Sequence, residues 1–227
     1  MSNIRYASFS ECGVRTNNED YIQIVSDPHH GRHLFALADG MGGHSFGETA
    51  SQVVCSTICD YWQHTSFDDG VEPVLRTAFR LASEALDAKA DVLHKAEMGT
   101  TLVLAAIDGN QLTIAYAGDS RAYLLRDEKV VYQTQDHINH SVWGDFIERS
   151  FFSYQRNKAD VEIHQFQLEP GDRILLCSDG VCQFVDPDIL TSRLMDDKSP
   201  EDVMDVILFL CEKFSKDNYS AILAYYE

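Results

Sequence analysis

Four aspartates stand at the ends of apolar segments that we interpret as strands: Asp39, Asp119, Asp179 and Asp217. Asp39 and Asp179 are each followed by glycine, which lets the backbone approach a ligand where a side chain would clash. Mg²⁺ and Mn²⁺ prefer oxygen donors and keep several waters, so a few carboxylates and a backbone carbonyl suffice to bind them. One such position alone would be an ordinary turn after a strand. Four of them favour a metal site.

Electrostatic repulsion supports a cation among these carboxylates. Two unit negative charges about 4 Å apart repel by roughly 4 kcal/mol at an effective dielectric of 20. A cluster of carboxylates without a metal would therefore strain the fold. One or two divalent ions would make the same cluster stabilising and would supply a water of lowered pKa.

Composition limits the class of protein. The chain has 227 residues, 44% of them hydrophobic, which suffices for one large core, so we expect a single domain over residues 1–227. A net charge of -18 argues against nucleic-acid and anionic-membrane partners, and any anionic substrate then needs local positive charge. The six cysteines form no Cys-x-x-Cys, and the sequence has neither a long apolar span nor a signal-peptide pattern. We expect a cytoplasmic monomer with reduced thiols.

The hydrophobic pattern places strands and helices in separate runs. Helical spacing predicts helices at 48–64 and 74–93, and Ser199-Pro-Glu-Asp202 predicts the start of a third. Strands are predicted at 5–9, 21–25, 33–38, 100–107, 111–117, 121–125, 161–168, 173–177 and 220–226. Residues 136–159 show no sustained period and are predicted to form a loop or lid with room for one helical turn. Without regular βαβ alternation, the pattern favours an α+β protein whose antiparallel sheets are covered by helices.

Eight short blocks occur in an order that resembles the metal-dependent serine/threonine protein phosphatases of the PP2C type, in their bacterial form. The blocks are Arg15-Thr-Asn-Asn-Glu-Asp20, Ala38-Asp-Gly-Met-Gly-Gly-His44 with Gly47-Glu48, Gly99-Thr-Thr101, Gly118-Asp-Ser-Arg121, Thr134-x-Asp-His137, Gly171-Asp172, Ser178-Asp-Gly180 and Asp217-Asn-x-Ser220. Each block is weak evidence, but eight in order are specific. The resemblance implies a four-layer α/β/β/α sandwich, a central antiparallel β-sandwich flanked by helices, with a binuclear Mg²⁺ or Mn²⁺ centre at one end.

The resemblance also implies ligands for the metal ions. Asp39 would bridge two ions, and Asp179 and Asp217 would hold the first of them. The Gly40 carbonyl would serve the second, together with Glu19 or Asp20. Some bacterial members bind a third, labile ion at positions that Asp119 and Asp179 match. A hairpin role for Asp119 in its Gly-Asp-Ser turn stays equally open.

Catalysis by such a site would use a metal-bridging water that attacks phosphorus in line. Arg15 would grip the phosphate oxygens, a task that suits the guanidinium fork, and would supply positive charge that an acidic protein lacks. Many eukaryotic members carry a candidate general acid, a histidine, where this chain has Met41. That role is therefore not transferred; a metal-bound water could protonate the leaving group instead, and His44, three positions later, is interpreted as structural.

Two further regions bear on substrate binding. Asp136 and His137 are expected to orient a turn near the site. Beyond them, the family's usual Thr-Arg-x-x-Gly-like segment is not recognisable in the sequence. The aromatic residues there, Phe151, Phe152 and Tyr154, would form either a protein-binding surface or, the favoured alternative, packing that holds the loop down.

Two functional hypotheses follow. The first is an active phosphatase for phosphoserine and phosphothreonine in proteins, whose partners are the targets of a serine/threonine kinase or the kinase itself. The second is a catalytically weak relative that binds a phosphorylated partner as a sensor. A thiolate mechanism lacks its motif, because no cysteine is followed six positions later by arginine, and a dinucleotide fingerprint fails at Ser45.

Overall fold

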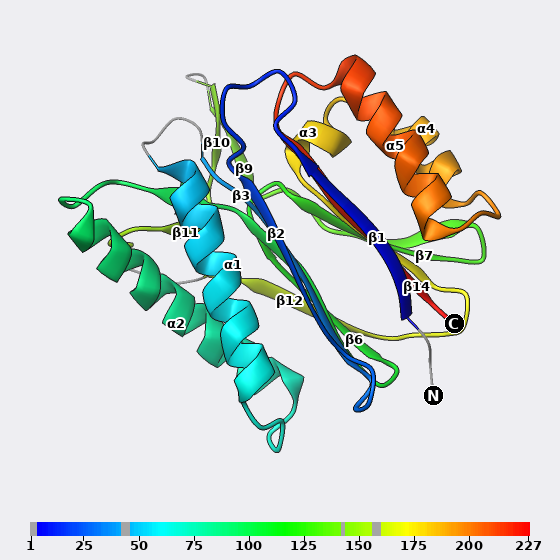
Figure 1. Cartoon of the computed structure of the whole chain (residues 1–227), viewed down its shortest axis with the longest axis horizontal. Helices are drawn as coiled ribbons and strands as arrows, with labels where there is room; N and C mark the ends of the chain where they lie inside the picture. Colours follow the sequence, from blue (N-terminus) through cyan, green and yellow to red (C-terminus); the bar gives the residue numbers. More distant parts are fainter. Residues whose placement is uncertain (1–3, 42–45, 142–143, 156–159) are drawn as a thin grey trace.

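The computed structural model describes residues 4–41, 46–141, 144–155 and 160–227 of the chain. Two five-stranded antiparallel sheets pack face to face, and helices cover the outer face of each sheet (Figure 1). This arrangement confirms the predicted α+β class and the four-layer α/β/β/α sandwich. His44, interpreted above as structural, lies outside the described residues.

The two large sheets are built from strands that are distant in sequence. The first has the order β1 (Ile4–Glu11), β14 (Tyr219–Tyr226), β13 (Arg173–Cys177), β7 (Arg121–Arg126) and β8 (Lys129–Gln133). The second has the order β12 (Glu162–Gln167), β6 (Gln111–Ala117), β5 (Leu102–Asp108), β3 (Arg32–Asp39) and β2 (Asp20–Asp27). Two small antiparallel pairs join β9 (Ile138–Ser141) to β10 (Gly144–Ile147), and β4 (Gly99–Thr100) to β11 (Phe151–Phe152).

Two helical layers complete the sandwich. The long helices α1 (Gly47–His64) and α2 (Val71–Val92) cover the second sheet, and the first sheet carries α3 (Asp179–Cys182), α4 (Pro187–Leu194) and α5 (Pro200–Phe214) (Figure 1). The predicted N-cap of α5 is confirmed, because the Ser199 hydroxyl accepts a hydrogen bond from the Asp202 amide at 3.1 Å. Among the described residues, no helix is both long and apolar enough to cross a membrane.

The central strands are apolar on both faces because each lies between two layers. In β3, Leu34 and Ala36 pack against the α1 and α2 side, whereas the alternate residues Phe35 and Leu37 pack between the two sheets. All four are essentially inaccessible to solvent. This double burial explains the uninterrupted apolar run before Asp39, and it makes the end of that run the point where the chain leaves the core.

The prediction for residues 136–159 was wrong. The described part of this region holds the β9–β10 hairpin and β11 rather than a loop with a helical turn. Its strands are too short to show a period, and β11 owes its form to pairing with Gly99 and Thr100, which the local sequence does not reveal. The short elements β8, α3 and α4 were also not predicted.

The three aromatic residues of this region differ in burial: Phe151 is buried, Phe152 is half-buried and Tyr154 is exposed, so the favoured packing interpretation holds fully only for Phe151. Phe151 is 1% exposed and contacts the Phe79 ring edge-on at a centroid distance of 6.3 Å. Tyr154 is exposed, but its hydroxyl donates to the Asp91 carboxylate at 2.9 Å. The segment after the β9–β10 hairpin is therefore fixed against α2. All six cysteines carry free thiols, and five of them are buried.

Candidate metal and phosphate site

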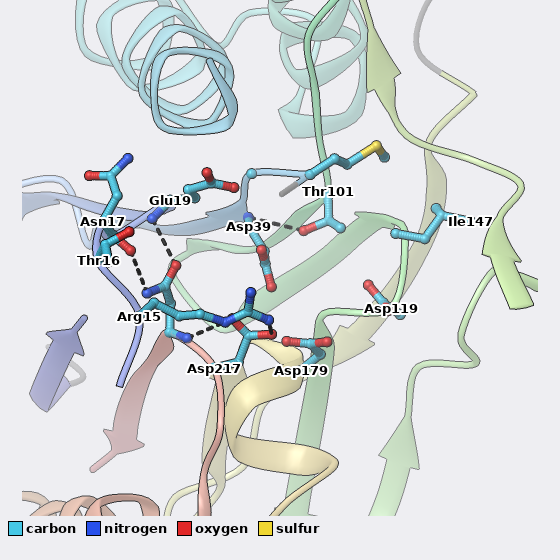
Figure 2. Close-up of a pocket in the computed structure, with 13 residues that line it drawn as sticks. Arg15, Thr16, Asn17, Glu19, Asp39, Thr101, Asp119, Ile147, Asp179 and Asp217 are labelled. Carbon is cyan, nitrogen blue, oxygen red and sulfur yellow. Dashed lines mark hydrogen bonds and ion pairs between the residues drawn. The ribbon is translucent and has the colours of Figure 1, made fainter. Parts of the chain in front are cut away.

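A pocket of about 400 Å³ opens at one end of the sandwich. The end of β3, the short helix α3 after β13 and the segment before β14 meet there with the loop between β1 and β2 (Figure 2). It is lined by Arg15, Thr16, Asn17, Glu19, Asp39, Gly40, Met41, Thr101, Asp119, Ile147, Asp179, Asp217 and Asn218. Residues separated by some two hundred positions thus share one wall, as expected if the strand-end aspartates act together.

Every predicted site residue but one lies on this wall. Figure 2 shows the carboxylates of Asp39, Asp119 and Asp179 pointing into the same space. The exception is Asp20, which pairs with Asp39 in the β2–β3 register but is buried behind it. Of the two alternatives for a ligand to the second ion, Glu19 faces the pocket.

The end of β3 is fixed by Thr101, the last residue of the Gly99-Thr-Thr101 block, for which the sequence predicted no role. The Asp39 amide donates to Thr101 Oγ1 at 3.1 Å, and the Thr101 amide donates to the Asp39 carbonyl at 2.8 Å. Thr101 Oγ1 also lies 2.8 Å from Ser120 Oγ, beside Asp119. Thr101 therefore holds the Asp39 and Asp119 segments at a fixed separation.

Asn218 has a similar structural role and was also missed. Its side-chain amide donates to the carbonyls of Cys12 and Asn17, both at 2.8 Å, while its Oδ1 accepts from the Glu19 amide at 2.9 Å. These bonds tie the loop that carries Arg15 and Glu19 to the strand that follows Asp217. The available signal was its position directly after Asp217 in the last block.

Two glycines allow the backbone of α1 to approach the pocket floor. A Cβ on Gly40 would lie 2.4 Å from the Gly47 carbonyl carbon, and a Cβ on Gly47 would lie 2.6 Å from a carboxylate oxygen of Glu19. Any larger residue would push these segments apart. The glycines thus keep the Gly40 carbonyl and the Glu19 carboxylate on the same side of the pocket.

Arg15 is the basic residue of the lining within the described part of the chain. Its Nη2 lies 2.7 Å from Asp217 Oδ2, and its side chain is 54% exposed at the mouth (Figure 2). An exposed ion pair of this kind contributes little to stability, at most about 1 kcal/mol. The guanidinium can therefore exchange part of this contact for an anion at little energetic cost.

The carboxylates of the site are poorly compensated by protein groups. Burial is the first cause that raises the pKa of Asp20, Asp119 and Asp179, each to about 6, and neighbouring carboxylates add to it. Burial and the charges of Asp20, Asp179 and Asp119 raise the pKa of Asp39 well above its ordinary value. Asp20 Oδ1 is buried and has no hydrogen-bond partner among the described residues.

This donor set fits a hard divalent cation. Oxygen donors prevail, and the accumulated negative charge is what such an ion would neutralise. In the present side-chain positions, no three carboxylate, imidazole or thiol groups of the described residues converge on one metal position. The fit is therefore one of donor chemistry and charge.

We expect Mn²⁺ to stabilise the folded protein more strongly at neutral pH than at acidic pH. A carboxyl group whose pKa is higher in the folded than in the unfolded protein favours folding when protonated, so its contribution to stability falls as pH rises from about 4 to about 6. Mn²⁺ must displace these protons. The rise in Tm caused by Mn²⁺ should thus be larger at pH 7.5 than at pH 5.5, as measured by calorimetry. An equal rise at both pH values would contradict this expectation.

Comparison with known proteins agrees with this geometry. The family model for protein phosphatase 2C matches residues 11–224. The chain therefore belongs to the protein phosphatase 2C family, and the resemblance noted from the sequence blocks is confirmed.

Individual relatives are bacterial. The chain is 32% identical over 239 residues to the serine/threonine protein phosphatase PstP of Mycobacterium tuberculosis, covering 97% of this chain and 45% of PstP. It is 34% identical over 202 residues to the protein phosphatase PhpP of Streptococcus pneumoniae, covering 79% and 81% of the two chains. A solved structure of the PstP catalytic domain in complex with two manganese ions covers all of this chain and 99% of its own, with 29% identity and a TM-score of 0.84. The chain thus spans about half the length of PstP but nearly all of its catalytic domain.

Proposed function

We propose that this chain is a Mn²⁺- or Mg²⁺-dependent phosphatase that hydrolyses phosphoserine and phosphothreonine in proteins and opposes a serine/threonine kinase. The observation that carries the proposal is the pocket in which, among the described residues, five carboxylates share one wall with a single arginine. Protein phosphatase function in PstP and PhpP, and manganese in the PstP structure, support it.

The carboxylates divide into three proposed metal positions. Asp39 would bridge two ions, with Asp179 and Asp217 on the first and Glu19 and the Gly40 carbonyl on the second. Asp119 and Asp179 would hold a third, weaker ion. Bound ions would lower the pKa of a water nucleophile and neutralise charge that develops on the phosphate. Buried Asp20 would hold the segment that carries Asp179, because the hydroxyl of the preceding Ser178 donates to Asp20 Oδ2 at 2.8 Å.

Arg15 would bind the phosphate. Its guanidinium is exposed at the mouth and can donate two parallel hydrogen bonds to phosphate oxygens. Its pairing with Asp217 aims it across the pocket, toward the side where Asp39 and Asp179 lie (Figure 2). A phosphoryl group held by Arg15 would therefore face the carboxylate cluster.

No imidazole lines the described pocket wall, and Met41 stands where a histidine acid would be expected. We therefore propose that water protonates the leaving serine or threonine oxygen. We also propose that residues 1–227 form a single domain, that the protein is a monomer and that it is located in the cytoplasm. The free thiols support the proposed location. The proposed partners are phosphorylated proteins, including the opposing kinase or its targets.

The proposal is tested by hydrolysis of p-nitrophenyl phosphate and of a phosphothreonine peptide. We expect turnover of both with Mn²⁺ or Mg²⁺ and complete loss in EDTA, because the nucleophile depends on the ion. Full activity in EDTA would overturn the metal mechanism. If the ion binds and neither substrate turns over, the chain is instead the sensor of a phosphorylated partner.

A further inference from the structure

A carboxylate outside the pocket links both ends of the β9–β10 hairpin. Glu162, the first residue of β12, lies 3.2 Å through Oε2 from His137 Nε2 and 3.3 Å from Arg149 Nη1. Its Oε1 accepts from the Tyr116 hydroxyl at 3.0 Å and lies 2.8 Å from His164 Nε2. His137 directly precedes the hairpin and Arg149 follows it by two residues.

The His137 contact continues to the pocket wall. The Gly118 amide donates to His137 Nδ1 at 3.3 Å, and the His137 amide donates to the Gly118 carbonyl at 2.9 Å. Because Nδ1 accepts, the proton of the neutral ring lies on Nε2 and points at Glu162. The ring also stacks on Tyr116 with a centroid distance of 4.7 Å. His137 thus connects Glu162 with the turn that carries Asp119.

The Arg149 contact holds the other end of the hairpin. Ile147, the last residue of β10, lines the pocket, and the Glu148 amide donates to the His137 carbonyl at 2.8 Å. Arg149 also pairs with Asp160 at 3.3 Å. One carboxylate therefore receives donors from both ends of a hairpin whose last residue lies over the site.

We propose that Glu162 is a positioning residue that fixes the β9–β10 hairpin relative to the Asp119 turn, and so sets how a phosphorylated peptide meets the pocket. This inference rests on the proposed phosphatase function. Donors on both oxygens distinguish Glu162 from an ordinary surface ion pair, and the His164 and His137 bonds hold its pKa at about 2 despite partial burial. Its effect falls on substrates that reach beyond the phosphate, because Glu162 itself lies outside the pocket lining.

The test replaces Glu162 with alanine. We expect the KM for a phosphothreonine peptide to rise about tenfold, the scale of one charge-assisted hydrogen bond. The KM for p-nitrophenyl phosphate should stay within about twofold, because this small substrate needs no hairpin contact. In the metal-free protein, hydrogen exchange of the Glu148 amide should quicken by about tenfold, a readout that does not depend on activity.

The matched control is Glu169→Ala, which removes a carboxylate paired with Arg126 and outside the pocket lining. It should leave both KM values and Glu148 exchange unchanged. If Glu162→Ala behaves like this control, or raises both KM values equally, the proposal is overturned. Should Glu162→Ala fail to fold, Arg149→Ala removes only the Glu162 contact that follows β10. A rise in the KM for the peptide without a rise in the KM for p-nitrophenyl phosphate then supports the proposal, and its absence overturns it. If the wild type is inactive on both substrates, the proposed function fails, while Glu148 exchange still tests the Glu162 contacts.

Discussion

Asp39→Asn is expected to lower turnover of p-nitrophenyl phosphate and of a phosphothreonine peptide by about 10³-fold, the upper range for removal of one preorganised electrostatic group. The substitution keeps the side-chain volume and the backbone bonds to Thr101 but removes the charge that two ions would share. Steady-state kinetics with saturating Mn²⁺ measures the loss. The metal-free variant should be at least as stable as the wild type, because a buried charge that repels three neighbours is gone.

Asp108→Asn is the matched control for this substitution. Asp108 ends the neighbouring strand β5 at the opposite end of the same sheet, where it pairs with Arg32 at 3.1 Å. We expect unchanged kinetics for this variant. Turnover by Asp39→Asn within a few-fold of the wild type would show that Asp39 does not bridge metal ions.

Arg15→Ala is expected to raise the KM for both substrates by about tenfold to a hundredfold, the range of a bidentate arginine–phosphate contact. The change in kcat should be much smaller, because Arg15 binds the phosphate in the ground state as well as in the transition state. Comparison of the two kinetic constants measures the effect. Stability should hardly change, because the Arg15–Asp217 pair is exposed.

Two variants sharpen this test. Arg15→Lys keeps the charge but loses the fork, so we expect an intermediate KM. Arg76→Ala removes an exposed arginine paired with Glu72 within α2 and should leave KM unchanged. An unchanged KM for Arg15→Ala would contradict the phosphate-binding role.

The layers of the fold could be predicted because the long strands and helices that form them each carry a hydrophobic pattern. In β3 the run from Leu34 to Ala38 is apolar at every position, and in α2 residues such as Leu75 and Leu86 recur at helical spacing. Because buried positions are apolar, an element that is buried on one or both faces shows a periodic or continuous apolar pattern in its sequence. The elements that were missed, β11 above all, are defined by a partner strand and leave no such pattern.

The site could be predicted only in part. The aspartates could be predicted because four of them stand at the ends of apolar segments, where one alone would be an ordinary turn residue, and because their order along the chain matched a family. Which of Glu19 and Asp20 faces the pocket depends on one β-strand alternation at the start of β2, a register that the sequence leaves open. The roles of Thr101 and Asn218 could not be predicted, because they consist of hydrogen bonds to backbone groups of segments that are distant in the sequence.

The metal centre is tested most directly by calorimetric titration with Mn²⁺. The protein is first treated with EDTA and then dialysed to remove the chelator. We expect at least two Mn²⁺ ions to bind per chain at pH 7.5, and weaker binding at pH 5.5. The heat of Mn²⁺ binding at the positions that Asp39 would share should be lost in Asp39→Asn but kept in Asp108→Asn. The absence of Mn²⁺ and Mg²⁺ binding, or binding unaffected by Asp39→Asn, would contradict the metal centre.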